Sequence, residues 1–301
     1  MSAGERRESA LKRKRLVRRL NEIRRQTSYT QADVAKEMHW SQSKVHRIET
    51  GENSISFNDL NALMGLYGLA DSDVFEELAK MAEVARRRSL PQISDIHSKD
   101  FRAFLESEIT ADTEREFENV FVPGLLQTSE YAGAVMRTLL EIDSATGDEK
   151  AARTDRARRI IEVREWRQQV FAEGGMTLAS FVLDEAVIRR VVGAESGDTS
   201  VMRGQLEHLK TMSRHERVDL RVLPFAAGAH VALSGPFVML GFKDPEDLPQ
   251  LYLENAAGES LTTQDEAHLT RFTANFEAIQ ARSVRGDELD ALLDHAIDAI
   301  R

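Results

Sequence analysis

One polar run near the N-terminus carries side chains that could perform a specific chemical task. The run extends from Thr30 to Gly51 and reads TQADVAKEMHWSQSKVHRIETG. Its second half presents amide, hydroxyl, ammonium, imidazole and guanidinium groups on Gln42, Ser43, Lys44, His46 and Arg47. Such groups hydrogen-bond to the edges of bases and to phosphate oxygens. Thr30 and Gln31 open the run, where the free backbone amides of a helix can meet a phosphate.

Two short helices joined by a tight turn would position these groups. Apolar or small residues recur at the spacing of a buried seam between crossing helices. They are Val34, Ala35, Met38, Trp40, Val45 and Ile48. Ser41 precedes the second helix and can cap its first amides. The spacing predicts a helix-turn-helix, and the alternative is an ordinary helical hairpin with a solvated polar face.

A basic helix is predicted ahead of this unit, over Ser9 to Gln26. Leu16, Leu20 and Ile23 form its apolar stripe. Arg18 and Arg19 belong to the basic cluster around the stripe and are candidates for phosphate contact, which would make DNA binding depend on salt. The alternative is a helix end whose charges only add solubility.

Two further helices complete an all-α domain at residues 1–90. One is predicted from Ser56 to Tyr67, where Gly68 stops it. The other is predicted from Ser72 to about Arg88, with Asp71 as its cap. SLPQIS, around the first proline at Pro91, is typical of a linker.

Composition and charge narrow the class of protein. The chain has 301 residues, 42% of them hydrophobic, and no cysteine, which excludes disulfides and thiolate zinc sites. No apolar run approaches the roughly 20 residues that span a bilayer, and the sequence favours the cytoplasm. Residues 1–50 hold 13 Lys and Arg against 6 Asp and Glu, whereas the whole chain has a net charge of −10. A basic N-terminal part on an acidic remainder favours a DNA-binding domain followed by a partner domain.

Residues 96–301 mix helical and strand patterns. Strands are predicted at 114–122, 218–225 and within 228–242, with a hairpin at LYLENAAGESL. The segment 176–185 is predicted to be a strand that passes into a helix. Helices are predicted near Phe101, at 129–142 with Ser129 as cap, and at 148–173, 202–214 and 286–300. Thr263 and Glu266 suggest a capping box for another helix to about Arg282. The expected fold is α+β, with a mostly antiparallel sheet and flanking helices.

Both parts resemble known families. LVRRLNEIRRQTSYTQADVAKEMHWSQSKVHRIETG resembles the Xre/Cro-type helix-turn-helix of actinomycete regulators, except that His39 replaces the usual turn glycine and Tyr29 a usual leucine. FVPGLLQTSEYAGAVMR, RRIIEVREWRQQVF, FVLDEAVIRRVVG and VDLRVLPFAAGAHVALSGPFVML resemble the Scr1-like (DUF5753) domain. The resemblance implies a transcription regulator, described as antitoxin-like in family naming and often paired with a small separately encoded protein.

No enzyme motif is found in residues 96–301, and neither an enzyme activity nor a cofactor is expected. P-loop, GxSxG and HExxH patterns are absent. His208 and His215 lie seven residues apart on one helix, which fits a surface pair as well as a ligand pair, and no metal site is expected. Two stretches, VPGLLQTSEYA and LPFAAGAHVALSGPF, could instead line a ligand pocket, contact a partner or be purely structural. Their candidate residues are Gln127, Tyr131, Phe225, His230, Ser234 and Phe237.

The sequence therefore predicts a two-part transcription regulator. Residues 1–90 would bind duplex DNA, and residues 96–301 would form a homodimer or sense a small-molecule ligand or a small partner protein. The first alternative is an antitoxin-like protein that mainly holds a small partner and binds DNA for autoregulation. The second is an enzyme fused to a DNA-binding domain, which no constellation of residues supports.

Overall fold

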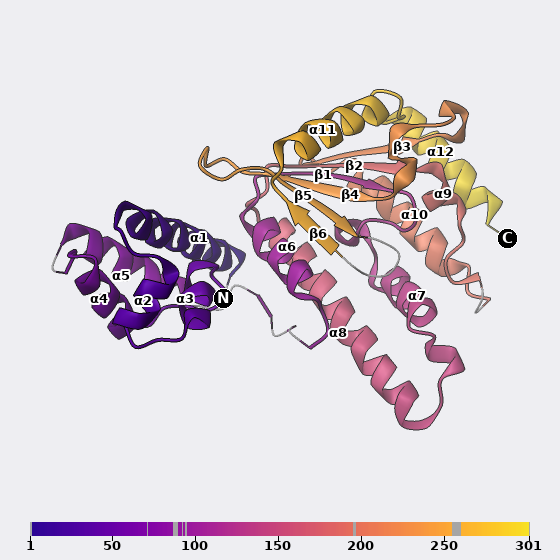
Figure 1. Cartoon of the computed structure of the whole chain (residues 1–301). Coiled ribbons are helices and arrows are strands. Elements are labelled where there is room, and N and C mark those ends of the chain that lie inside the picture. Colours follow the sequence, from indigo (N-terminus) through magenta and orange to yellow (C-terminus); the bar gives the residue numbers. More distant parts are fainter. Residues whose placement is uncertain are drawn as a thin grey trace. The chain divides into compact units, whose positions relative to one another are not determined.

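The computed structural model describes residues 2–70, 72–86, 90–91, 93, 95–194, 197–254 and 260–300. The chain divides into two compact units, Met1–Pro91 and Gln92–Arg301, which we call the head and the body (Figure 1). Within the described residues, no helix is both long enough and apolar enough to cross a membrane. Ser89, Gln92 and Ser94 of the expected SLPQIS linker lie outside the described ranges.

The head consists of α1 (Ala3–Gln26), α2 (Gln31–Glu37), α3 (Gln42–Glu49), α4 (Phe57–Leu66) and α5 (Asp73–Ala85). Its core combines the predicted apolar residues of α1, α2 and α3 with further residues of α4 and α5, namely Leu60, Leu63, Met64, Leu78, Ala82 and Ala85. α1 begins earlier than predicted, because Ser2 and Glu5 form a capping box at its start. Ser72, not Asp71, caps α5 by accepting a hydrogen bond from the Phe75 amide. Asp71 itself lies outside the described residues.

The helices of the body are α6 (Lys99–Thr110), α7 (Ser129–Leu139), α8 (Gly147–Ala172), α9 (Glu185–Arg189), α10 (Ser200–Met212), α11 (Glu266–Gln280) and α12 (Asp287–Ala299). Its strands are β1 (Thr113–Glu118), β2 (Leu178–Asp184), β3 (Val218–Leu223), β4 (Phe237–Gly241), β5 (Gln250–Glu254) and β6 (Ser260–Thr263). The turn of the predicted hairpin between β5 and β6 lies outside the described residues.

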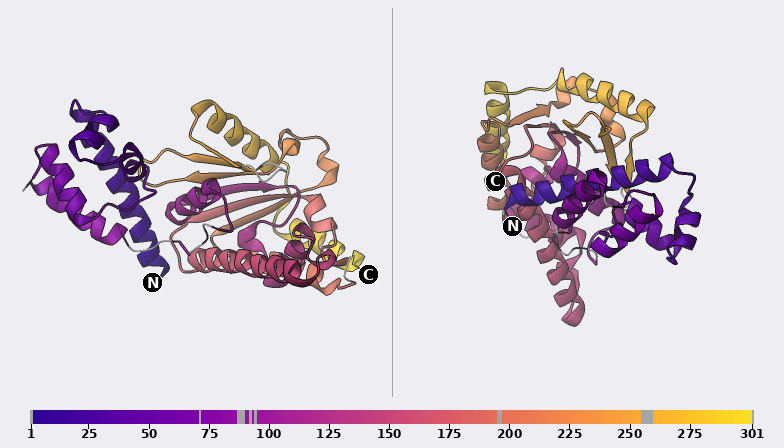
Figure 2. Two further views of the ribbon diagram at one scale, coloured as in Figure 1. Left: turned by 60° about the horizontal axis from the view of Figure 1, so that its bottom comes forward. Right: turned by 90° about the vertical axis from the view of Figure 1, so that its left-hand side faces the viewer.

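The strands form one mixed sheet in the order β3-β2-β1-β4-β5-β6. The pairings of β1 with β2 and of β2 with β3 are parallel, and the other three are antiparallel. The α+β class is thus confirmed, although the antiparallel majority is narrow. α11 covers one face of the sheet, and α6 and α8 lie against the other (Figures 1 and 2). The α11 face buries an aromatic cluster that includes Phe117, Phe237 and Phe276.

Three local predictions for the body are wrong. Thr128, one residue before the predicted Ser129, caps α7 through the Tyr131 amide. Asp265 caps α11, because its carboxylate accepts a hydrogen bond from the His268 amide. The capping box predicted from Thr263 and Glu266 is not formed. β1 ends at Glu118 rather than at residue 122, and Glu114 and Glu116 along it are buried.

Candidate nucleic-acid interface

The turn between α2 and α3 holds the two helices at a fixed angle. Val34, Ala35, Val45 and Ile48 are all buried where the helices meet. His39 lies in the turn with φ of +52°, a left-handed conformation that histidine tolerates better than most residues. The Trp40 amide returns a hydrogen bond of 2.8 Å to the carbonyl of Ala35. These contacts confirm the buried seam that the spacing predicts.

α3 presents the predicted polar row on its outer face. The Ser41 hydroxyl accepts a hydrogen bond of 3.1 Å from the Lys44 amide, which confirms its expected role as cap. Four side chains of the row are exposed, namely Gln42, Ser43, His46 and Arg47. The first turn of α3 is therefore closed by its cap, while these four side chains remain accessible.

Lys44 differs from the rest of the row because it already has partners within the head. Its ammonium lies 2.9 Å from the Asp59 carboxylate on α4 and 3.9 Å from the centre of the Trp40 ring. About a third of the side chain is exposed. A phosphate or base that takes up Lys44 must therefore compete with the Asp59 pair.

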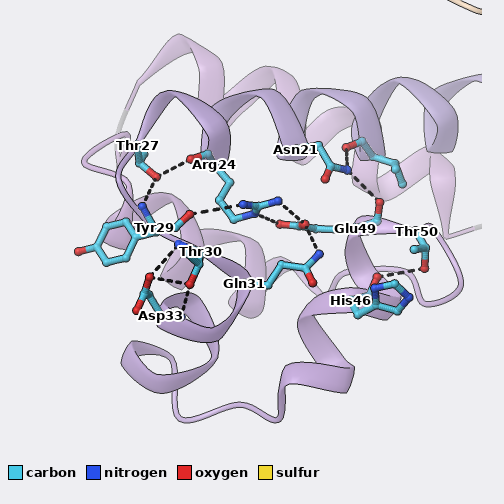
Figure 3. A network of polar contacts seen from close by, with 11 residues as sticks. Asn21, Arg24, Thr27, Tyr29, Thr30, Gln31, Asp33, His46, Glu49 and Thr50 are labelled. Carbon is cyan, nitrogen blue, oxygen red and sulfur yellow. Dashed lines mark hydrogen bonds and ion pairs between the residues drawn. The ribbon is translucent and has the colours of Figure 1, made fainter.

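A polar network joins α1, α2 and α3 behind the row (Figure 3). The Glu49 carboxylate accepts from Arg24 Nε at 2.6 Å, from Arg24 Nη2 at 3.0 Å and from Gln31 Nε2 at 2.7 Å. Asn21 Nδ2 donates to the carbonyl of Glu49 at 2.9 Å. Glu49 is only 8% exposed, so this bidentate pair is stronger than a surface pair. The network holds the end of α3 on α1 and orients Gln31 at the start of α2.

The first turn of α2 is closed by a capping box. The Thr30 hydroxyl accepts from the Asp33 amide at 3.2 Å, and Asp33 accepts in return from the Thr30 amide at 2.9 Å. The hydrogen bonds from Thr30 hold the pKa of the Asp33 carboxyl below its ordinary value. Thr30 and Gln31 therefore begin a helix whose N-terminus is well defined.

The arginines of α1 are less open than the sequence suggests. Arg19 pairs with Glu22 at 2.9 Å, and Arg18 is half-buried. Arg13 Nη2 donates to the carbonyl of Ala85 at the end of α5. A cation stabilises the carbonyl end of a helix, so Arg13 also has a structural task.

In the body, Gln127 and Tyr131 hold the chain turn that follows β1. Both side chains are buried. Gln127 Nε2 donates to the carbonyl of Val122 at 2.7 Å, and the Tyr131 hydroxyl accepts from the Val122 amide at 3.3 Å. Gln205 of α10 also stabilises this turn. Its Oε1 accepts from the Thr128 amide, and its Nε2 donates to the carbonyl of Leu126. These contacts favour the structural interpretation of VPGLLQTSEYA.

The loop that precedes β4 is divided between buried and exposed residues. Phe237 is buried, whereas Phe225 is 58% exposed and Ser234 is exposed. The His230 side chain is only 3% exposed, and its Nε2 lies 3.3 Å from the carboxylate of Asp184 at the end of β2. Its ring meets Phe117 edge-on. The structure thus separates the four candidates into an inner pair, His230 and Phe237, and an outer pair, Phe225 and Ser234.

Sequence patterns miss a buried ionic cluster on the α6–α8 face of the sheet. Arg167 of α8 forms a bidentate pair with Glu108 of α6, with Nε at 2.8 Å from Oε2. Glu114 and Glu116 lie on β1 and are 0% and 5% exposed. Burial, together with neighbouring Glu118, raises the pKa of Glu116 to about 8. Alternating charges normally indicate a solvated strand face, so no local signal reveals this cluster.

The prediction that His208 and His215 share one helix is wrong, because α10 ends at Met212 and His215 lies in the turn that follows. His208 and His215 are half-buried, and His215 Nδ1 accepts from the Arg217 amide. Burial lowers the pKa of His208. Across the described part of the chain, no group of three or more histidine, aspartate or glutamate side chains could hold a metal ion.

Comparison with known protein families finds a matching family for each unit. Residues 15–78 match a helix-turn-helix domain, and residues 101–295 match a domain of unknown function, DUF5753. These matches confirm the arrangement expected from the resemblance. No curated protein and no solved structure matches the chain.

Proposed function

The chain belongs to the DUF5753 family and carries a helix-turn-helix domain ahead of it, and we propose on this basis that it is a sequence-specific DNA-binding transcription regulator. The exposed polar row on the capped helix α3 is the observation that supports this proposal most strongly. A helix of this kind presents side chains to the major groove. The ion pair between Arg24 and Glu49 holds the end of α3 on α1.

Within the proposal, the residues of the head divide by the type of contact. Gln42, Ser43, Lys44 and Arg47 contact base edges or flanking phosphates, with Ser41 and His46 beside them. Thr30 and Gln31 contact a phosphate at the start of α2, and Arg18 and Arg19 add affinity that falls with salt.

The body would join two heads and respond to a signal. A single head binds weakly, and a two-fold dimer would place two α3 helices about one DNA turn apart on a palindromic site. A ligand or a small partner protein that binds the body would then change how the two heads meet DNA.

A surface of the body also supports the antitoxin-like alternative. Phe225, Val231 and Leu233 lie on one loop and are each more than half exposed. Exposed apolar side chains that cluster in this way are typical of protein contact. A small protein encoded beside the gene that co-purifies with the chain, and loses binding when Leu233 is replaced by Ser, would favour this function.

The DNA-binding proposal is tested by Arg47→Ala in the full chain. The Arg47 side chain is exposed, and its one hydrogen bond within the described structure runs from Nε to the Ser43 carbonyl at 3.3 Å. Its loss is therefore expected to weaken specific binding at least tenfold, with the thermal stability unchanged. Lys80→Ala removes an exposed cation from α5 and is the matched control. Equal binding by both variants would contradict the role assigned to α3.

A further inference from the structure

Lys44 lies apart from the exposed side chains of α3. Successive residues of a helix are about 100° apart, so the four exposed side chains of the polar row share one arc that runs from Gln42 to Arg47. Lys44 lies about 60° beyond Arg47 around the helix axis, at the border of the buried side. Its side chain is only partly exposed, whereas those of Gln42 and Arg47 are exposed. This position suits contact with a flanking phosphate better than contact with a base edge.

Two groups of the head hold the Lys44 ammonium in place. Its Nζ lies 2.9 Å from Oδ1 of Asp59 and 3.9 Å from the centre of the Trp40 ring. Asp59 lies in the first turn of α4, where its amide donates a hydrogen bond of 3.0 Å to the Ser56 hydroxyl. A carboxylate is favoured in the first turn of a helix. The anion that holds Lys44 is therefore fixed on a helix other than α3.

The ion pair between Lys44 and Asp59 is accessible from solvent. The exposed fractions of the two side chains are 34% and 29%. A pair of this kind favours the paired state by up to about fivefold, and contact with a ring face adds a similar factor of about two to five. A phosphate oxygen that takes up Lys44 must therefore break contacts that the free protein already makes.

We infer that Asp59 sets the DNA affinity of the head by restraining Lys44. When DNA binds, a phosphate oxygen replaces the Asp59 carboxylate, so Lys44 exchanges one anion for another. Lys44 then adds less affinity than an unpaired cation would. Phosphates are present in every sequence, and the restraint therefore lowers the affinity for all duplex DNA. Asp59 is in this sense a positioning residue, which acts on DNA through Lys44. The inference rests on the proposed function, because it concerns how the same surface is regulated.

A double-mutant cycle in the full chain tests the inference. Its probe is a short fluorescent duplex of random sequence, and the measurement is binding anisotropy at low salt. Asp59→Asn keeps the side-chain shape and the backbone amide that bonds Ser56, and it is made with and without Lys44→Gln. The effect in the Lys44→Gln background reports the general repulsion between the carboxylate and DNA. With Lys44 present, Asp59→Asn is expected to raise the affinity by a further factor of about three to five. Equal effects in the two backgrounds would overturn the inference.

A matched control separates the restraint from a simple loss of negative charge. Asp73→Asn removes an exposed carboxylate from the first turn of α5. Its effect on DNA binding is expected to be the same with and without Lys44→Gln. If Asp73→Asn depends on Lys44 as strongly as Asp59→Asn does, the contact with Asp59 has no special role and the inference fails.

The salt dependence shows whether Lys44 leaves Asp59 for a phosphate. Lys44→Gln is expected to flatten the plot of log affinity against log salt by about one unit, because one phosphate contact is lost. An unchanged slope would mean that Lys44 stays with Asp59 in the complex and would overturn the exchange. This comparison needs no change at Asp59, so it still decides if Asp59→Asn does not fold.

The emission of Trp40 provides a second signal of the exchange. In a Trp166→Phe chain, Trp40 is the remaining tryptophan. DNA should change its emission because the ammonium moves off the ring, and Lys44→Gln should remove most of that change. An emission change that is the same with and without Lys44 would contradict the movement of the ammonium.

Failure of this inference is distinguishable from failure of the proposed function. Specific binding to an operator, without the excess effect of Asp59→Asn, would refute the restraint alone. The excess effect on random duplex, with no operator recovered from genomic DNA, would refute specific recognition and leave the restraint. Absence of any DNA binding at low salt would refute both.

Discussion

At the residue scale, the head depends on a few side chains whose partners lie far away in sequence. Glu49 is 25 residues from Arg24 and 18 from Gln31, yet its carboxylate bonds both. Local patterns cannot pair such residues, because only the folded arrangement of α1, α2 and α3 brings them together. The apolar seam was predictable because Val34, Ala35, Val45 and Ile48 follow helical periodicity within one short segment.

Replacement of Glu49 by alanine is expected to destabilise the head by about 3 kcal/mol, because it leaves the Arg24 guanidinium half-buried and without its carboxylate. Tryptophan fluorescence can follow the head alone, since the chain has two tryptophans, Trp40 in the head and Trp166 in the body. Urea unfolding in a Trp166→Phe background measures the change. Glu22→Ala breaks only the more exposed pair with Arg19 and should cost less than about 1 kcal/mol.

At the turn residue His39, a substitution is expected to increase the stability of the head rather than to lower it. A left-handed backbone costs a residue with a Cβ about 1 kcal/mol, and glycine avoids this strain. His39→Gly is therefore expected to raise the stability of the head by up to about 1 kcal/mol in the same assay. A loss of stability would mean that the imidazole contributes more than the strain costs.

At the scale of elements, the turn after β1 packs closely against Arg167 of the buried ionic cluster. A Cβ placed on Gly124 would lie 2.8 Å from Nη1 of Arg167, which Glu108 holds in place. The sequence does not show that this glycine makes room for a buried guanidinium. The helices and strands themselves were largely predictable, whereas caps shifted by one or two residues, as at Thr128 and Asp265.

Gly124→Ala is therefore expected to destabilise the body by about 1–3 kcal/mol through overpacking. Fluorescence of Trp166 in a Trp40→Phe background during urea unfolding provides the measurement. Gly133→Ala on α7 is the matched control, because its Cβ would meet no atom closer than 3.9 Å and alanine favours the helix. If Gly124→Ala proves as stable as Gly133→Ala, the Arg167 side chain is free to move aside.

At the scale of the whole molecule, the two units were expected from charge, periodicity and resemblance, but the inner face of the body was not. A strand with alternating glutamates predicts a solvated face, and the tertiary fold reverses this by placing α6 and α8 over it. The information lies in the packing of distant elements, which one sequence does not reveal.

The buried glutamates make the stability of the body depend on pH. Burial raises the pKa of Glu116 and of Glu118 to about 8, above the ordinary value of 4.5. Between these values the folded state keeps protons that the unfolded state releases, so stability falls as pH rises. The slope for each such group is about 1.4 kcal/mol per pH unit. The urea midpoint of the body should therefore drop from pH 6 to pH 8, and Glu116→Gln should flatten the change; a midpoint that rises with pH would contradict the buried row.

The central claim is specific DNA recognition by the full chain, and capture of fragmented genomic DNA tests it most directly. The protein is mixed with the fragments at low and at raised salt, and the retained DNA is sequenced. The account predicts a palindromic motif that persists at raised salt, with half-sites about one helical turn apart. Uniform retention that disappears as salt rises, without a shared motif, would show charge attraction alone and contradict the claim.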